Sequence, residues 1–340
     1  MTTTPHKVAV IGGGNWGQNL VRNFYTILGP ERTVVCDTRP AILAQLVQRH
    51  PGLQTTTDFQ SVLGDPSVDG VAIATPVMTH HQLATQALEA GKHVFVEKPL
   101  TTAPAEAEEL CALAERLHRV LMVDHLLLFH PAYQELDRLV KAGELGDLYH
   151  MHARRTNLGV VRTEENALWS LGPHDVAVAL QVIGKRPSRV SAQGAVHLQP
   201  GAGIQDVVFV TMSFPGGQLA HLHLSWLDPS RERKVTFVGS RKMAIVDEQD
   251  PTAKLRLFPK GADVSAAGVT MRDGKAEEPK ISNEEPLALT CKAFLDSIDR
   301  GKALLSDGRI GLEVVRVLQA GQESLDAGGA VITLAQESLR

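Results

Sequence analysis

The 340-residue sequence has little cysteine, and its three cysteines are widely separated. Cys36, Cys111 and Cys291 form no Cys-x-x-Cys pair, and their number is odd. This spacing indicates neither a disulfide framework nor a cysteine metal site, so we predict no bound metal. Free thiols of this kind fit a reducing cytoplasm.

The sequence also lacks a strong excess of charge and a long apolar run. Its formal net charge is -4, and its basic residues do not gather in clusters. Such a chain has no global attraction to nucleic acid or to anionic membranes, so we expect a small-molecule substrate. No run approaches membrane-spanning length, and the N-terminal residues carry no apolar signal core. We therefore expect no membrane contact and predict a cytoplasmic protein.

What the sequence does contain is an apolar run that leads into three spaced glycines, Gly12, Gly14 and Gly17. Gly12 permits a tight turn, Gly14 lets the backbone approach a pyrophosphate, and Gly17 lets the following helix pack closely on the strand. The N-terminus of that helix then faces the phosphates. The pattern predicts a dinucleotide site in which Asn15 and Trp16 also take part.

A second apolar run ends in an acid, Asp37. An acid at this place accepts hydrogen bonds from the adenosine ribose and repels a 2′-phosphate, which favours NAD over NADP. Thr38 and Arg39 are expected at the same end of the cofactor, although the charge of Arg39 weakens the preference for NAD. The alternative is a structural turn in a domain that binds no nucleotide.

Short β-branched runs alternate with helical ones as far as about residue 124. The expected strands are residues 8–11, 33–37, 68–75, 92–96 and 120–123. This alternation is typical of a doubly wound parallel sheet. We therefore predict an α/β protein with an NAD-binding Rossmann domain at residues 1–123.

Beyond that point the apolar pattern has mostly a period of two. The expected strands are residues 148–156, 189–198, 206–214, 218–227, 234–238, 243–247 and 254–258, with helices near 131–141 and 168–183 and two more in 286–325. We predict that residues 124–340 form an α+β substrate domain with a large, open, mostly antiparallel sheet. An open sheet face must be covered, so we expect a homo-oligomer, a dimer or a tetramer, packed through it.

An acid and a base follow the predicted strand 92–96. Glu97 and Lys98 stand at its carboxyl end, the edge at which open α/β sheets bind ligands, so we expect them to border the nicotinamide. Pro99 is a candidate for a cis peptide bond. The alternative is a simple ion pair between Glu97 and Lys98 at the strand end.

These motifs resemble the Gfo/Idh/MocA oxidoreductase family over nearly the whole chain. The resemblance rests on the three glycines, on Thr75 and Pro76 with His80, and on the run that ends in Glu97-Lys98-Pro99. It implies NAD as the cofactor and Lys98 as a catalytic residue. It also implies that Thr75, Pro76 and His80 lie near the nicotinamide, with His80 in a supporting role.

A second family element is a helix entered through Gly-x-His, here residues 172–174. The resemblance implies that His174 faces Lys98 across the substrate. Oxidation of an alcohol needs a base for the hydroxyl proton, and histidine titrates nearest neutrality whereas lysine must first be desolvated. We therefore predict that His174 is the base and that Lys98 polarises the reacting oxygen, with the reverse assignment open; the alternative for His174 is a helix-capping role.

The chain departs from the commoner family pattern near this histidine. Ser170 and Ala177 stand where aspartates are usual, so the roles of those two acids are open, and Asp175 is a candidate to replace them.

Residues 155–159, 162–166 and 168–175 resemble the branch that acts on nucleotide-activated amino sugars. This resemblance implies NAD-dependent oxidation of the 3-hydroxyl of UDP-N-acetylglucosamine, followed by a partner aminotransferase that makes a 2,3-diamino sugar for the lipid A of lipopolysaccharide. The corresponding uronate, or another sugar of the family, is an alternative substrate. A non-catalytic NAD-binding sensor is a further alternative, against which the presence of both Lys98 and His174 argues.

A nucleotide diphosphate needs donors, and Arg155, Asn157 and Arg162 lie in one loop-prone region that offers them. Trp169 and His125 complete the expected substrate site. The alternatives are surface or oligomer contacts for the arginines and a hydrogen-bonded position at the domain junction for His125.

Overall fold

The computed structural model describes residues 6–303 and 305–335. The chain divides into two compact units, unit 1 with Met1–Phe129 and Glu284–Val315, and unit 2 with His130–Asn283 and Arg316–Arg340. The division predicted from the sequence lay between residues 123 and 124 and kept residues 284–315 in the second domain. The two divisions therefore differ for these segments.

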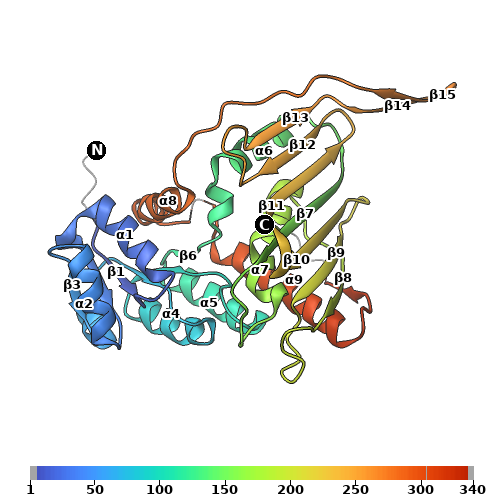
Figure 1. Ribbon diagram of the computed structural model, residues 1–340. Coiled ribbons are helices and arrows are strands. Elements are labelled where there is room, and N and C mark those ends of the chain that lie inside the picture. The colour runs from blue at the N-terminus through green and yellow to red at the C-terminus, as the bar shows by residue number, and fades with distance from the viewer. Residues whose placement is uncertain (1–5, 304, 336–340) are drawn as a thin grey trace. The chain divides into compact units, whose positions relative to one another are not determined.

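Unit 1 contains a six-stranded parallel sheet in the order β3-β2-β1-β4-β5-β6 (Figure 1). The strands are β1 (Val8–Ile11), β2 (Thr33–Cys36), β3 (Gln54–Thr56), β4 (Gly70–Ile73), β5 (His93–Val96) and β6 (Leu121–Val123). The predicted doubly wound α/β sheet is confirmed. The sequence analysis missed β3, because a polar edge strand of three residues carries no apolar pattern.

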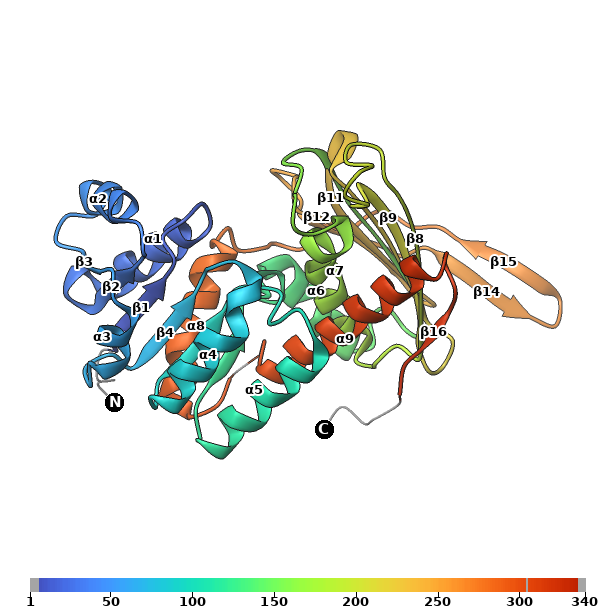
Figure 2. The same ribbon diagram turned by 90° about the horizontal axis from the view of Figure 1, so that it is seen from below.

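Helices flank both faces of this sheet. They are α1 (Gly17–Leu28), α2 (Pro40–Arg49), α3 (Phe59–Gly64), α4 (His80–Glu89), α5 (Pro104–Arg116), α8 (Pro286–Arg300) and the first part of α9 (Gly308–Asp326), with short 3₁₀ turns η1 (Pro30–Arg32), η2 (Val77–Thr79) and η3 (Leu126–Phe129). Right-handed crossovers place α1 on one face, where it packs with α8, and place α4 and α5 together on the other (Figure 2).

An aromatic cluster explains why α8 belongs to unit 1. The rings of Phe24 on α1, Phe95 on β5 and Phe294 on α8 contact one another, with centroids 5.5 to 6.5 Å apart. All three side chains are fully buried. Their burial therefore ties a segment late in the sequence to the N-terminal sheet.

Unit 2 contains an eight-stranded sheet in the order β13-β12-β11-β7-β10-β9-β8-β16. The strands are β7 (Leu148–Leu158), β8 (Arg189–Ala195), β9 (Val207–Ser213), β10 (Leu219–Ser225), β11 (Leu227–Gly239), β12 (Met243–Asp247), β13 (Leu255–Phe258) and β16 (Ile332–Thr333). All neighbours pair antiparallel except β7 and β10, so the predicted mostly antiparallel sheet is confirmed. Helix α6 (Pro131–Lys141) packs on β12, and α7 (Ala167–Ile183) packs on β7, β9 and β10.

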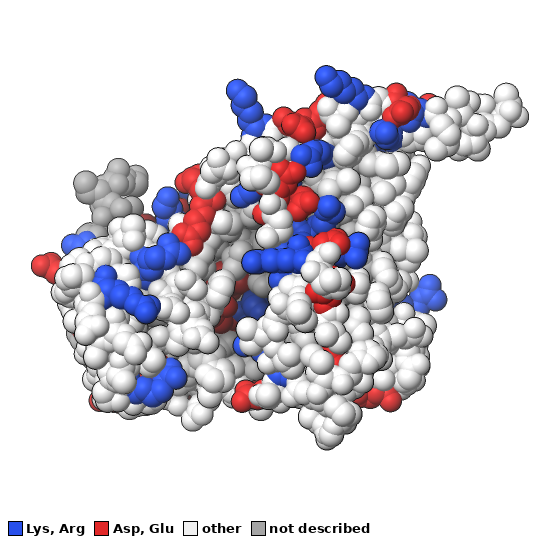
Figure 3. Space-filling model, viewed as in Figure 1, with Lys and Arg blue, Asp and Glu red and all other residues white. Residues whose placement is uncertain are grey.

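A two-stranded ribbon, β14 (Gly261–Ser265) and β15 (Gly268–Arg272), projects from unit 2 and was not predicted (Figure 1). Its side chains alternate, so that Val264, Val269 and Met271 share one face and are 80%, 65% and 76% exposed. The tip carries no charged side chains on the surface seen in Figure 3. Arg272 anchors the base by donating hydrogen bonds to the carbonyl oxygens of Ser240 and Arg241.

Within the described residues, no helix combines the length and the apolar character needed to cross a membrane.

Candidate active site

The glycine turn after β1 has the shape of a phosphate cradle. Gly12 has a φ of +91°, and a Cβ on Gly17 would lie 1.9 Å from the carbonyl oxygen of Gly12, so α1 begins hard against the turn. A Cβ on Gly14 would meet nothing closer than the guanidinium of Arg39 at 3.6 Å, which leaves space for a ligand to approach the backbone. Asn15 and Trp16 are exposed beside this space. The turn therefore fits the pyrophosphate of a dinucleotide.

Asp37 is buried at the carboxyl end of β2 and touches the same turn. Its Oδ2 accepts a hydrogen bond of 2.9 Å from the backbone N–H of Gly13, and Arg39 donates to both carboxylate oxygens at 2.9 Å. Hydrogen bonds from Arg39 lower the pKa of Asp37 to about 2. Thr38 and the Arg39 side chain are exposed, so this end of the cradle carries a buried carboxylate and an exposed guanidinium.

The loops after β4 and β5 are joined by His80. Its Nδ1 lies 3.0 Å from the carbonyl oxygen of Pro99 and its Nε2 lies 3.0 Å from that of Thr75, and the imidazole is 1% exposed. Burial lowers the pKa of His80. The expected cis peptide bond between Lys98 and Pro99 is confirmed. His80 therefore supports the segment that carries Lys98, while Pro76 is exposed.

Glu97 connects the Lys98 segment to the glycine turn. The indole Nε1 of Trp16 donates a hydrogen bond to Oε1 of Glu97, and the backbone N–H of Lys98 lies 3.3 Å from Oε2. Glu97 is buried, whereas the Lys98 side chain is only partly buried. Unit 1 thus brings Trp16, Glu97 and Lys98 together at the carboxyl edge of its sheet.

The next strand adds two groups at the same edge. Asp124 and His125 follow β6 and are 0% and 1% exposed, and neither ring nitrogen of His125 has a hydrogen-bond partner among the described residues. Burial and the charge of Lys98 lower the pKa of His125 to about 3. The sequence analysis did not single out Asp124, although its position directly after a strand in register with β5 could have done so.

In unit 2, His174 lies in the middle of α7. The expectation that residues 172–174 form the entrance of a helix is wrong, and so is the alternative in which His174 caps one. The helix begins earlier, because the side chain of Asn166 accepts a hydrogen bond of 3.2 Å from the backbone N–H of Trp169. Trp169 and His174 are partly buried one and a half turns apart, and Ser170 and Ala177 are buried on the same helix.

Arg155 occupies a different place from the one that the sequence suggested. Its guanidinium is 5% exposed and donates hydrogen bonds of 2.8 and 2.9 Å to Asp175, and a further one of 2.8 Å to Glu248. Tyr133 donates to the same Glu248 oxygen at 3.1 Å. The guanidinium N–H groups that we expected to face a diphosphate are therefore used within the protein. We call this group of side chains the Arg155 cluster; it contains Arg155, Asp175, Tyr133 and the partly buried Glu248.

The other expected substrate residues of unit 2 remain on its surface. The Arg162 side chain is 55% exposed and lies 3.8 Å from Glu165, and Asn157 is partly buried at the end of β7. Arg154 is 47% exposed and pairs with Glu232 at 3.2 Å. Lys98 and His125 belong to unit 1, whereas Arg155, Asn157, Arg162, Trp169 and His174 belong to unit 2.

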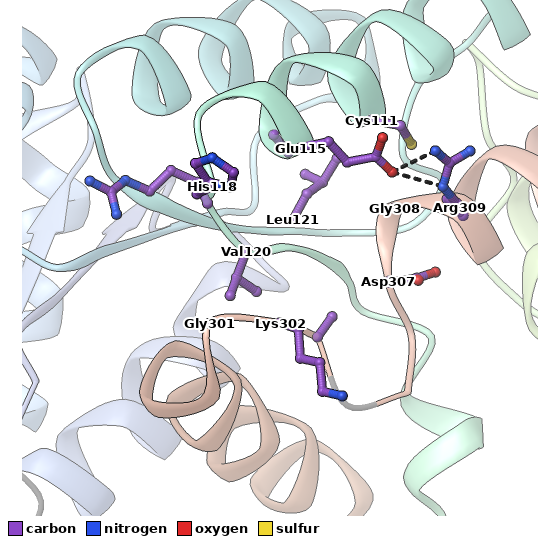
Figure 4. Close-up of a pocket in the computed structure, with 13 residues that line it drawn as sticks. Cys111, Glu115, His118, Val120, Leu121, Gly301, Lys302, Asp307, Gly308 and Arg309 are labelled. Carbon is purple, nitrogen blue, oxygen red and sulfur yellow. Dashed lines mark hydrogen bonds and ion pairs between the residues drawn. The ribbon is translucent and has the colours of Figure 1, made fainter.

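A cavity of about 300 Å³ in unit 1 lies away from this edge (Figure 4). It is lined by the amino end of β6, by α5 and by the start of α9, where Glu115 and Arg309 form an ion pair. Lys98 follows the carboxyl end of β5, which runs parallel to β6. The cavity therefore lies at the amino ends of these strands, opposite to Lys98. Among the described residues, no group of three or more His, Cys, Asp or Glu side chains is arranged to hold a metal ion.

Known proteins similar to this chain share both units. Residues 6–125 match the model of the oxidoreductase family with an NAD-binding Rossmann fold, and residues 133–245 match the GFO/IDH/MocA C-terminal domain. The chain is 26% identical to D-glucoside 3-dehydrogenase of Escherichia coli, over 97% of this chain and 98% of that protein. It is 28% identical to UDP-N-acetylglucosamine 3-dehydrogenase of Acidithiobacillus ferrooxidans, over 73% and 76%.

A solved structure of UDP-N-acetylglucosamine 3-dehydrogenase from Acidithiobacillus ferrooxidans has the same fold, with a TM-score of 0.82. It is 24% identical to this chain and covers 95% of it, and the match includes 98% of that structure. The glycine cradle, the acid after β2 and the two matching family models lead to one conclusion. The chain belongs to the Gfo/Idh/MocA family and is an NAD-binding oxidoreductase.

Proposed function

We propose that this protein oxidises the 3-hydroxyl of UDP-N-acetylglucosamine with NAD, and that an aminotransferase then uses the 3-keto product to make a 2,3-diamino sugar. The observation that carries the proposal is the position of Lys98 at the carboxyl edge of β5, joined through Glu97 and Trp16 to the glycine turn. Two relatives are named for oxidation at position 3 of a sugar.

The chemistry needs little from the protein beyond positioning and proton transfer. NAD, when bound, accepts the hydride that leaves carbon 3. His174 takes the proton of the 3-hydroxyl, while the Lys98 ammonium donates a hydrogen bond to the same oxygen as the C=O bond forms. Gly14 leaves room for the pyrophosphate, and Asp37 accepts from the adenosine ribose.

A neutral glucoside is a second candidate substrate. The buried position of Arg155 favours it, because three of this arginine's hydrogen bonds are already made to Asp175 and Glu248. Arg162 and Arg154 keep exposed guanidinium groups and are the residues that we propose for a diphosphate or for the carboxylate of the uronate.

The test is NADH formation with UDP-N-acetylglucosamine, UDP-N-acetylglucosaminuronate and a methyl glucoside, each with and without a 3-keto-sugar aminotransferase and glutamate to remove product. Lys98→Met and His174→Gln should each lower kcat/KM by roughly 10²- to 10⁴-fold. His197→Gln, at an exposed position in unit 2 outside the strands, is the control and should leave it unchanged. NAD binding without turnover of any of the three sugars would reject these substrates and favour another sugar of the family or the sensor.

We also propose that the chain forms a homo-oligomer through the open face of the unit 2 sheet. Phe209 and Leu219 on that face are 42% and 45% exposed, and the ribbon adds the apolar face of Val264, Val269 and Met271. Light scattering of the wild type and of Phe209→Lys tests this, since a buried lysine should dissociate the assembly. A monomeric wild type would contradict the proposal.

A further inference from the structure

Two acidic side chains stand next to each other at the carboxyl edge of the unit 1 sheet. Strands β5 and β6 are parallel, with Val96 opposite Val123, so Glu97 and Asp124 are the next residues in register. The backbone N–H of Asp124 donates a hydrogen bond of 2.7 Å to the carbonyl oxygen of Val96, which holds the two strand ends together. Glu97 is 7% exposed and Asp124 is 0% exposed. Both carboxyl groups are therefore removed from water.

The two carboxyl groups have different surroundings. Glu97 accepts from the indole of Trp16 and weakly from the backbone N–H of Lys98. Among the described residues, neither oxygen of Asp124 has a donor in good hydrogen-bond geometry; its side-chain neighbours are Glu97 and the indole of Trp16, whose aligned hydrogen bond goes to Glu97. A buried carboxylate without a donor is costly, and two adjacent carboxylates repel each other. One proton held between them removes both costs, because it supplies an O–H donor and leaves a single negative charge.

The other ionisable groups around the pair fix the local charge. Lys98 follows β5, His125 follows β6, and Cys291 faces the pair from α8. Burial lowers the pKa of His125 to about 3, so this imidazole is neutral at neutral pH. Burial, Asp124 and Glu97 raise the pKa of the Cys291 thiol, so it is neutral too. Lys98 is then the cation that the carboxyl pair faces.

Burial and the neighbouring carboxyl group raise the pKa of Glu97, and burial raises the pKa of Asp124. Both raised pKa values agree with a carboxyl pair that keeps one proton at neutral pH.

We propose that Glu97 and Asp124 share one proton and act as a monoanion that holds the Lys98 side chain as an ammonium, which makes Asp124 a positioning residue for Lys98. The role that this gives Lys98 in turnover rests on the proposed function. The protonation state of the pair does not, because it concerns unit 1 alone.

The proposal predicts an unusual pattern among amide variants. Asp124→Asn leaves an ionised Glu97, and Glu97→Gln leaves an ionised Asp124, so each single variant keeps one negative charge beside Lys98. The double variant, Glu97→Gln with Asp124→Asn, removes that charge. We expect the pKa of Lys98 to stay within about 0.5 unit of the wild-type value in each single variant and to fall by about 1 to 3 units in the double variant.

The measurement is the pH dependence of Lys98 acylation in the whole chain, followed by peptide mass spectrometry, with no sugar present. Glu109→Gln is the matched control, since this carboxylate is exposed on α5. A fully ionised pair would instead give equal, additive falls in the two single variants, and that result would overturn the proposal. So would a double variant with unchanged Lys98 titration.

Infrared spectroscopy of the wild type keeps the proposal testable if the double variant does not fold. A carboxylic C=O band that shifts on ¹³C labelling of aspartate and glutamate and is lost in Asp124→Asn supports the shared proton. Its absence from the wild type at neutral pH contradicts it. Because neither experiment uses a sugar, inactivity toward every tested substrate would reject the proposed function and leave this inference standing.

Discussion

Both units hold two carboxyl groups close together in or near the core, but they compensate them in different ways. In unit 2, Asp175 and Glu248 are bridged by Arg155, which donates three hydrogen bonds of 2.8 to 2.9 Å to them. In unit 1, no guanidinium among the described residues bridges Glu97 and Asp124, and Lys98 is a neighbouring cation. An arginine fixes a charge permanently, whereas a carboxyl pair and a lysine exchange protons. The comparison separates a cluster held by a permanent charge from one in which a shared proton sets the charge.

The largest expected effect is on the stability of unit 2. Arg155→Met leaves the buried Asp175 and the partly buried Glu248 without the cation that hydrogen-bonds them, although Arg233 stays near, and we expect the free energy of unfolding to fall by about 3 kcal/mol. Arg154→Met, at the neighbouring and exposed position on β7, should cost less than about 1 kcal/mol. Urea unfolding of both variants measures the difference. Equal losses of unfolding free energy would mean that the Arg155 cluster stabilises the fold no more than the exposed ion pair of Arg154 does.

The second prediction concerns the acid stability of unit 1. The folded pKa of His125 is about 3, below the value near 6.5 of an unfolded histidine, so folding releases a proton. Its contribution to stability is complete above about pH 6.5 and is lost as the pH falls toward 3. Between pH 6.5 and 4.5 we expect a loss on the order of 2 to 3 kcal/mol. His80 and His93, whose pKa values burial also lowers, add to this fall.

Unfolding measured against pH for the wild type and His125→Leu isolates the share of His125. The variant should show a smaller fall below pH 6.5, while the surface variant His81→Leu should follow the wild type. A His125→Leu curve parallel to that of the wild type would show that the imidazole binds protons equally in the folded and unfolded states, which contradicts the lowered pKa.

The smallest expected effect concerns Asp37, a carboxylate whose surroundings are intermediate between those of the two carboxyl pairs. Asp37 is a buried carboxylate whose cationic partner, Arg39, has an exposed side chain. Asp37→Asn should weaken NAD binding about 10-fold, the cost of losing a hydrogen bond to a charged group, and should reduce discrimination against NADP. Calorimetric titration with both cofactors tests this, with Asp273→Asn on unit 2 as the control. Unchanged affinity for NAD would place the adenosine ribose elsewhere.

Much of the fold and part of the site could be predicted because the signals are local. The glycine spacing, the acid after β2 and the Glu97-Lys98-Pro99 run each follow a strand that its β-branched residues reveal. Period-two alternation predicted most strands of unit 2. The ribbon was missed because its strands are short and lie between glycines. The sequence could not show that α8 packs with the N-terminal sheet, because that depends on the contacts of Phe294 with Phe24 and Phe95.

The roles of individual charged residues were harder to predict. The sequence suggested Arg155 as a donor for a diphosphate. In the structure its donors are used by two carboxylates that are 20 and 93 residues away in sequence. Asp124 carries no motif, and its pairing with Glu97 comes from the register of two parallel strands.

The sequence by itself determined the doubly wound sheet and the mostly antiparallel sheet, because apolar periodicity is encoded by neighbouring residues. It also indicated NAD through the glycine turn and Asp37, and the family through the resemblance of these and the Glu97-Lys98-Pro99 motifs. Only the tertiary structure decided which charges are compensated. Burial and the identity of the facing group set whether a carboxylate is ionised, and residues distant in the chain supply both.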